Sequence, residues 1–195
     1  MKMQENKKLL NQIREYWNEH IHDLEIVNHP IGSKGFFEDL DEYRFDKLRY
    51  LPRIVDFNSY QGKKVLEIGC GAGVDLIRFA RGGAQVTGVD LSETAVDLAK
   101  KNFKINDFKA DLQVMNGEAL DFKDNSFDLV YVHGVLQYTA DSRKMAEESF
   151  RVLQEGGEFI GMVYNRKGWL NVLSKLMKVG LEHEDAPVLD MYTID

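Results

Sequence analysis

The sequence feature that most constrains the fold is the run VLEIGCGAG at residues 65–73. It opens with a short apolar run typical of a buried strand and continues with alternating glycines at positions 69, 71 and 73. Glycine permits a sharp turn and lets a ligand approach the main chain closely. A helical pattern follows over residues 74–81, and Gly82 and Gly83 end it. A strand, a glycine-rich turn and a helix in this order predict an open α/β sheet that binds a ligand at the carboxyl end of the strand.

The residues after this turn alternate between strand and helix patterns. One helix is predicted to begin after the N-cap Ser92 and another to span residues 141–154. Strands that alternate with helices favour a parallel sheet covered on both faces, and right-handed crossovers make such a sheet doubly wound. We therefore predict an α/β, mostly parallel, Rossmann-like sheet, with further strands at 85–90, 112–115, 127–132 and 157–164.

A helical extension is predicted ahead of this core, over residues 1–60. Apolar residues recur at helical spacing in residues 5–20 and again in residues 39–57, where Pro52 ends or kinks the second helix. Residues 28–37 carry glycine, proline and serine and are expected to break the pattern.

The length of 195 residues suits one domain with a small extension. Its Rossmann-like core is assigned to residues 61–165. Residues 166–195 are expected to hold a helix at 169–179 and an acidic, loop-like tail.

Charge and cysteine content exclude several classes of function. The chain has 25 Lys and Arg against 32 Asp and Glu, a formal net charge of −7, which argues against a nucleic-acid partner. Cys70 is the single cysteine, so neither an intramolecular disulfide nor a cysteine-based zinc site is expected. No apolar stretch is long enough to span a membrane, and the polar N-terminus is not typical of a secretion signal. We expect a cytoplasmic protein.

Polar residues follow the predicted strands, at the edge where ligands bind in such sheets. Asp90 ends the second strand, and an acidic side chain there can accept hydrogen bonds from both hydroxyls of a ribose, although it can also cap a helix. Asn116, Gly117 and Glu118 follow the third strand, where a solvated turn is an equally good interpretation. His133 follows the fourth strand, and a lone histidine is more often a structural residue than a base.

An NAD-linked oxidoreductase is one alternative. The dinucleotide fingerprint G-x-G-x-x-G requires a glycine at position 74, where this chain has Val74. This departure weakens the dinucleotide interpretation.

In their order along the chain, residues 65–73, 86–92, 116–122, 126–138 and 151–157 resemble the class I S-adenosylmethionine-dependent methyltransferases. The resemblance covers about residues 62–164 and is closest to small-molecule enzymes of the ubiquinone and menaquinone biosynthesis type. It implies S-adenosylmethionine as cofactor, S-adenosylhomocysteine as product and no metal ion. It also implies in-line displacement of the methyl group by a small-molecule acceptor.

The same resemblance assigns cofactor contacts to individual residues. Gly69, Gly71 and Gly73 would lie against the methionine portion, with Glu67 near its ammonium group. The ribose and adenine would be held by Asp90, Leu91, Asn116, Gly117 and Glu118. His133 would lie near the methionine portion and the acceptor.

The acceptor site is less well defined by the sequence. His133 and Tyr138 are candidate proton acceptors for a neutral nucleophile. The helical extension is expected to cover the cofactor and to contribute to the acceptor pocket, although ordinary helix packing explains each of these residues as well: Tyr16, Trp17, Phe36, Phe37, Tyr43 and Arg44. Methylation of amino groups in nucleic acid or protein is disfavoured, because residues 132–135 read VHGV rather than an Asn/Asp-Pro-Pro-Tyr motif.

The chain also departs from the family pattern. Asn116 replaces a frequent aspartate, and Asp121 and Glu155 replace common turn prolines. The two final strands of the family sheet have no counterpart in residues 165–195. Either the methyltransferase is truncated, or a second subunit completes the sheet edge in a homodimer. A noncatalytic module that binds the cofactor or a partner therefore stays an alternative.

Overall fold

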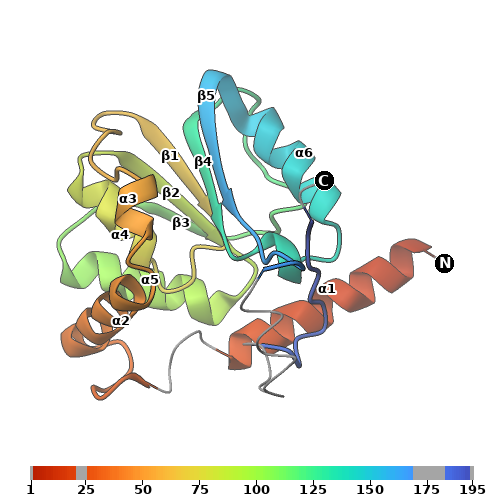
Figure 1. The fold of residues 1–195 in the computed structure, drawn as a ribbon, viewed down its shortest axis with the longest axis horizontal. Helices are drawn as coiled ribbons and strands as arrows, with labels where there is room; N and C mark the ends of the chain where they lie inside the picture. The colour runs from red at the N-terminus through yellow and green to blue at the C-terminus, as the bar shows by residue number, and fades with distance from the viewer. Residues whose placement is uncertain (1, 21–25, 169–182, 194–195) are drawn as a thin grey trace.

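The computed structural model describes residues 2–20, 26–168 and 183–193, and these contain one five-stranded sheet (Figure 1). All strand pairs are parallel and the order is β3-β2-β1-β4-β5. The strands are β1 (Lys64–Ile68), β2 (Gln85–Asp90), β3 (Asp111–Val114), β4 (Phe127–His133) and β5 (Leu153–Met162). The predicted α/β, doubly wound fold is confirmed.

The topology places a ligand crevice beside the central strand. The chain runs outward from β1 through β2 to β3, then returns to add β4 and β5 on the other side of β1. Glu67 of β1 lies in register with Gly88 of β2 and Tyr131 of β4. The carboxyl ends of these three strands therefore meet at the point where the strand order reverses, which is the usual ligand site in such sheets.

Helices cover both faces of the sheet because side chains alternate along each strand. Val65, Leu129 and Tyr131 pack on one face with α4 (Val74–Arg81) and α5 (Glu93–Ile105). Leu66 and Val130 pack on the other face with α6 (Ser142–Val152). As predicted, α4 ends at Gly82, and Ser92 caps α5 through a bond from the Ala95 amide.

The helical extension differs in detail from the sequence prediction. It comprises α1 (Lys2–Glu19), α2 (Lys34–Lys47) and α3 (Leu51–Ile54). The expected break over residues 28–37 is wrong at its end, because Ser33 caps α2 and accepts a hydrogen bond from the Phe36 amide at 3.2 Å. Phe36 and Phe37 are buried against α5, and this packing outweighs the low helix propensity of Gly35. The predicted helix 39–57 is divided, and Pro52 lies in the first turn of α3.

Helix α1 docks on the start of α5 through polar contacts. The Ser92 hydroxyl donates to the Asn18 side-chain oxygen at 2.8 Å and lies 3.1 Å from the Trp17 carbonyl. The Thr94 amide donates to the same Asn18 oxygen at 3.3 Å. The end of α1 is therefore fixed beside the loop that follows β2.

The predicted boundary near the last strand is also wrong. Helix α6 ends at Val152 rather than 154, and β5 begins at Leu153 rather than 157. Gly156 has φ of 75°, and a register shift between Phe127 and Leu129 lets the strand continue through the glycines that the sequence suggests as a turn.

The predicted helix at 169–179 lies outside the described residues. Residues 183–193 contain no helix or strand, but Tyr192 forms an isolated parallel bridge with Asn165. None of the helices within the described ranges is long and apolar enough to cross a membrane.

Candidate functional site

A cavity of about 820 Å³ lies at the carboxyl ends of the central strands. This volume is within the range of small-molecule sites. Its floor is formed by the ends of β1, β2 and β4 and the loops after them. Its walls include Leu10, Ile13 and Trp17 of α1, Arg44 of α2, and Met191 near the C-terminal end.

The glycine turn after β1 brings the main chain to the cavity surface. Gly69 and Gly71 have φ of 74° and 52°, in the left-handed region that favours glycine. A Cβ on Gly69 would lie 2.3 Å from the Val135 side chain, whereas a Cβ on Gly71 would meet no atom within 4 Å. Gly71 therefore faces open space in the cavity. Gly73 lies outside the lining and begins α4, with Phe103 and Ala99 against it.

Asp90 connects the glycine turn to the start of α5. One carboxylate oxygen accepts a hydrogen bond from the Gly71 amide and the other accepts one from the Ser92 amide, both at 2.9 Å. Desolvation raises the pKa of Asp90 above its usual value, although these amide bonds partly oppose it. The side chain lines the cavity.

Glu67 is the most distinctive acidic group of the cavity. Its side chain is 4% exposed, and Oε2 is buried with no hydrogen-bond partner among the described residues. Desolvation, and then the negative charge of Asp75, raise the pKa of Glu67 well above its ordinary value. A buried carboxylate with an unsatisfied oxygen is suited to a positively charged, hydrogen-bond-donating ligand.

A buried ion pair joins the helical extension to the site. Arg44 of α2 donates from Nε and Nη2 to the two carboxylate oxygens of Asp75, at the start of α4. The Tyr131 hydroxyl donates to the same carboxylate at 2.8 Å. Burial opposes ionisation of Asp75, but the charge and hydrogen bonds of Arg44 outweigh it and keep the pKa of Asp75 below its usual value.

Asp75 is a site residue that sequence reasoning missed. An acidic residue in the first turn of a helix is stabilised by the helix dipole, so its charge already had a local explanation. Its partners Arg44 and Tyr131 are 31 and 56 positions away in the sequence. No local pattern links such residues.

The two candidate catalytic residues both line the cavity. His133 ends β4, and its Nδ1 lies 3.1 Å from Nη2 of Arg44. The His133 ring stacks near that of Tyr131, with centroids 5.9 Å apart. Tyr138 lies in the short helix η2 (Leu136–Tyr138), and its ring meets Trp17 edge to face at 5.1 Å.

The remaining predicted cofactor residues are divided between the cavity and the protein interior. Leu91, Asn116 and Gly117 line the cavity. Glu118 lies outside the lining, and its Oε1 accepts hydrogen bonds from the Thr139 hydroxyl and from the Asp141 amide. The Glu118 carboxylate therefore has hydrogen-bond donors within the protein and does not require a ligand.

The residues suggested for the acceptor pocket also lie in different places. Trp17 and Arg44 line the cavity. Phe36 and Phe37 are buried between α2 and α5, and the Tyr43 ring lies below the Lys47 ammonium. Tyr16 does not line the cavity either, and its hydroxyl donates a hydrogen bond to Asp185 at 2.8 Å.

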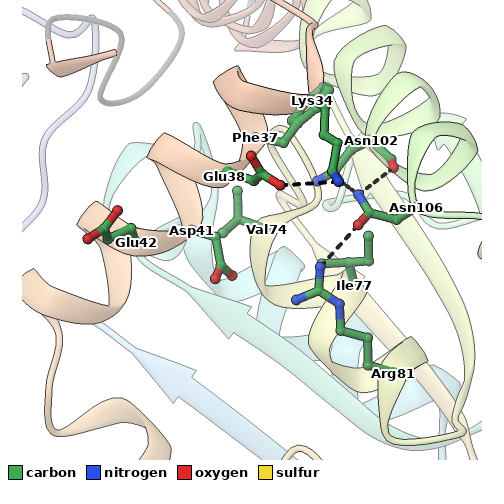
Figure 2. A pocket seen from close by; sticks show the side chains of 10 residues that line it. All are labelled: Lys34, Phe37, Glu38, Asp41, Glu42, Val74, Ile77, Arg81, Asn102 and Asn106. Carbon is green, nitrogen blue, oxygen red and sulfur yellow. Dashed lines mark hydrogen bonds and ion pairs between the residues drawn. The ribbon is translucent and has the colours of Figure 1, made fainter. Parts of the chain in front are cut away.

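A second pocket, of about 240 Å³, lies between α2, α4 and α5 (Figure 2). Lys34 pairs with Glu38 of the same helix, and the Asn106 side chain donates to Asn102 and accepts from Arg81. These polar groups therefore bind one another, in contrast to Glu67 in the larger cavity. No group of three or more His, Cys, Asp or Glu is arranged to hold a metal ion in the described part of the chain.

A comparison of the sequence with known protein families finds a match over the segment that forms this site. The family described as "Methyltransferase domain" matches residues 66–161, from the glycine turn through β5. Residues 66–161 therefore form a methyltransferase domain of the class I S-adenosylmethionine-dependent type. In this methyltransferase domain, the glycine turn and Asp90 lie where the sequence resemblance predicts, at the ends of β1 and β2.

Relatives of this methyltransferase domain include two ubiquinone biosynthesis O-methyltransferases. The one from Coxiella burnetii is 29% identical over 120 residues, covering 62% of this chain and 50% of the relative. The one from Idiomarina loihiensis is 36% identical over 139 residues, covering 70% and 56%. The chain thus spans about half the length of these curated relatives.

A solved structure shares the fold. It is the geranyl diphosphate C-methyltransferase from Streptomyces coelicolor A3(2), in complex with Mg²⁺, geranyl diphosphate and S-adenosyl-L-homocysteine. The TM-score is 0.61 at 17% identity, and the match covers 92% of this chain and 76% of the other.

Proposed function

We propose that the large cavity binds S-adenosylmethionine and that the chain transfers its methyl group to a small-molecule acceptor. The observation that carries this proposal is the buried Glu67 carboxylate, with its unsatisfied Oε2, beside the glycine turn. When bound, S-adenosylmethionine supplies an activated methyl group on a cationic sulfur, together with an ammonium group. Glu67 is suited to the ammonium group, and the names of the relatives support the same chemistry.

The charge of the cavity floor favours this cofactor over NAD. Glu67, Asp75 and Asp90 line the floor, and Arg44 is already paired with Asp75. The Asp90 carboxylate would repel the phosphates of a dinucleotide, and Arg44, being paired with Asp75, does not offset that repulsion. Val74 in place of a third fingerprint glycine points in the same direction.

The protein groups around the cavity suit distinct parts of the cofactor. Gly71 leaves its main chain open to the methionine portion, since a Cβ at this position would meet no atom within 4 Å. The Asp90 oxygens each retain a lone pair for a ribose hydroxyl beyond their amide bonds. Leu91, Asn116 and Gly117 are proposed to surround the adenine.

Methyl transfer then depends mainly on positioning. The acceptor nucleophile attacks the methyl carbon in line with the sulfur–carbon bond, which breaks as the new bond forms. Correct orientation of two bound reactants can lower such a barrier by about 7–11 kcal/mol. Apolar residues of α1, such as Leu10 and Ile13, exclude water and suit an acceptor with an apolar surface.

The proposal is tested by isothermal titration calorimetry with S-adenosylhomocysteine. We expect micromolar binding to the 195-residue chain and loss of binding in Asp90→Ala. The matched control is Asp97→Ala, since Asp97 is an exposed aspartate on α5 that does not line the cavity. This control should bind as the unaltered chain does.

NAD is titrated in parallel. Binding of NAD with no binding of S-adenosylhomocysteine would support the oxidoreductase alternative and refute the proposal. Binding of S-adenosylhomocysteine without turnover of any acceptor would instead support a noncatalytic cofactor-binding module.

A further inference from the structure

The contact between Arg44 and His133 determines which ring nitrogen carries the proton. Nη2 of Arg44 lies 3.1 Å from Nδ1 of His133. A guanidinium has five N–H donors and no acceptor. Nδ1 must therefore accept this hydrogen bond with its lone pair, and the proton of the neutral ring lies on Nε2.

The guanidinium is held in place from other directions. Arg44 forms its two-pronged contact with Asp75, and the side chains of these residues are 18% and 2% exposed. Tyr131, which stacks near the His133 ring, donates to the same carboxylate. Burial would lower the pKa of Arg44, but the charge of Asp75 outweighs it and raises that pKa, so the donor stays charged.

We propose that Arg44 is a positioning residue that holds His133 neutral, with its proton on Nε2, so that His133 acts as a hydrogen-bond donor and not as the general base. The role of His133 in methyl transfer rests on the proposed function, whereas the protonation and tautomer of its ring do not. The only basic nitrogen of the ring is occupied by the Arg44 bond. To take a proton from an acceptor, His133 would have to break that bond and become a second cation beside Arg44.

The charges around His133 agree with this assignment. The groups that face it are Arg44 from α2, Asp75 from α4, and Tyr131 from the same strand, with Glu67 on the neighbouring strand β1. Both oxygens of the Asp75 carboxylate already accept from Arg44. A proton released by the acceptor therefore leaves by a route that does not include His133.

The test is the ¹⁵N spectrum of the imidazole nitrogens in the whole chain near neutral pH. The chain has five histidines, and the signals of His133 are those missing from His133→Gln. We expect a protonated signal for Nε2 and a non-protonated signal for Nδ1. A proton on Nδ1, or a doubly protonated ring, would overturn the proposal.

Variants test whether Arg44 causes this state. Arg44→Met should shift both nitrogen signals towards a mixture of tautomers. Because this change leaves a buried carboxylate alone, Arg44→Met combined with Asp75→Asn provides a second variant without an unpaired buried charge. Unchanged His133 signals in the double variant would refute the role of Arg44.

The matched control is Arg78→Met. Arg78 also forms a two-pronged pair between α4 and α2, with Asp41 at 2.9 and 2.7 Å, but it does not line the cavity. The His133 signals should be unchanged in this variant. Calorimetry with S-adenosylhomocysteine on the unaltered chain separates the two ideas, since absence of binding refutes the proposed function while the nitrogen signals alone decide the state of His133.

Discussion

At Gly71 the main chain faces the cavity with no side chain between them. A substitution at this position can therefore affect ligand binding without disturbing side-chain packing, because a Cβ there would contact no protein atom. Gly62 has the same backbone property outside the cavity, with φ of 74° and no atom within 4 Å of a Cβ. The two glycines therefore form a matched pair.

We predict that Gly71→Ala and Gly62→Ala each lower the free energy of unfolding by about 1–2 kcal/mol, the usual cost of a left-handed backbone for an L-residue. In Gly71→Ala, S-adenosylhomocysteine should bind at least about tenfold more weakly, a loss of about 1.4 kcal/mol. In Gly62→Ala the affinity should be unchanged. Urea unfolding and calorimetry measure the two effects, and equal affinities in both variants would contradict the placement of Gly71 at the cofactor.

Glu67 gives a second prediction, for the dependence of stability on pH. Its pKa is raised in the folded protein, first by desolvation and then by Asp75, so the folded state holds a proton that the unfolded state releases. As the pH rises above about 4.3, the ordinary pKa of a glutamate, this group makes folding progressively less favourable until its folded pKa is passed.

Glu67→Gln removes this dependence. We expect the variant to have a higher free energy of unfolding than the unaltered chain at neutral pH, with the difference disappearing towards pH 4. Urea unfolding at a series of pH values measures it. The same difference at every pH would show that Glu67 is not the titrating group.

Individual site residues were predictable from sequence only where a local pattern exists. Gly69, Gly71 and Asp90 follow strands and belong to ordered motifs. Arg44 was assigned to the cavity only through its place in the helical extension, because its partner His133 is 89 positions away. Physical contacts of this kind depend on the packing of α2 and leave no periodic signal.

At the scale of the elements, α1 is held beside the loop after β2 by a side chain near its end. Asn18 near its end accepts hydrogen bonds from Ser92 and Thr94, directly after the Asp90 loop. We predict that Asn18→Ala weakens the docking of α1 by about 1–3 kcal/mol, because the two hydrogen bonds that it accepts are each worth about 0.5–1.5 kcal/mol.

Hydrogen exchange of the α1 amides measures this change, and exchange should become faster across the helix. The control is Asn11→Ala, since Asn11 is exposed on the same helix. Equal exchange in the two variants would mean that Asn18 does not hold α1 in place.

Strands and helices of the core were predicted more accurately than the segments next to them. The strands β1, β2 and β4 were predictable because each is a short run rich in β-branched and apolar residues next to glycine or polar turn residues. The start of α2 was missed because glycine and serine indicate a loop, whereas Ser33 caps the helix and two buried phenylalanines stabilise it. The start of β5 was missed because Gly156 and Gly157 indicate a turn, whereas the register shift against β4 accommodates them.

Across the whole molecule, segments from opposite ends of the chain line the cavity, among them α1 and Met191. Figure 1 shows the C-terminal segment running past α1. Tyr16 of α1 donates to Asp185, a residue 169 positions later. Burial, and then this bond, raise the pKa of Tyr16 to about 12. Nearby, the Trp17 and His183 rings lie 4.8 Å apart.

We predict that Tyr16→Phe loosens residues 183–193 by about 1–2 kcal/mol, because the hydroxyl loses its hydrogen bond to the Asp185 carboxylate and its contact with Nδ1 of His183. The free energy of unfolding of the core should change less. Hydrogen exchange of these amides provides the measurement. Tyr43→Phe is the control because Tyr43 contacts Lys47 through its ring, and an equal effect of this variant would contradict the prediction.

The contact between Tyr16 and Asp185 joins two residues that are 169 positions apart. Such a contact closes a very long loop of chain, and the entropy lost on closure grows only slowly with the length of the loop. A cavity wall built from α1 and Met191 therefore costs little more in chain entropy than one built from neighbouring segments.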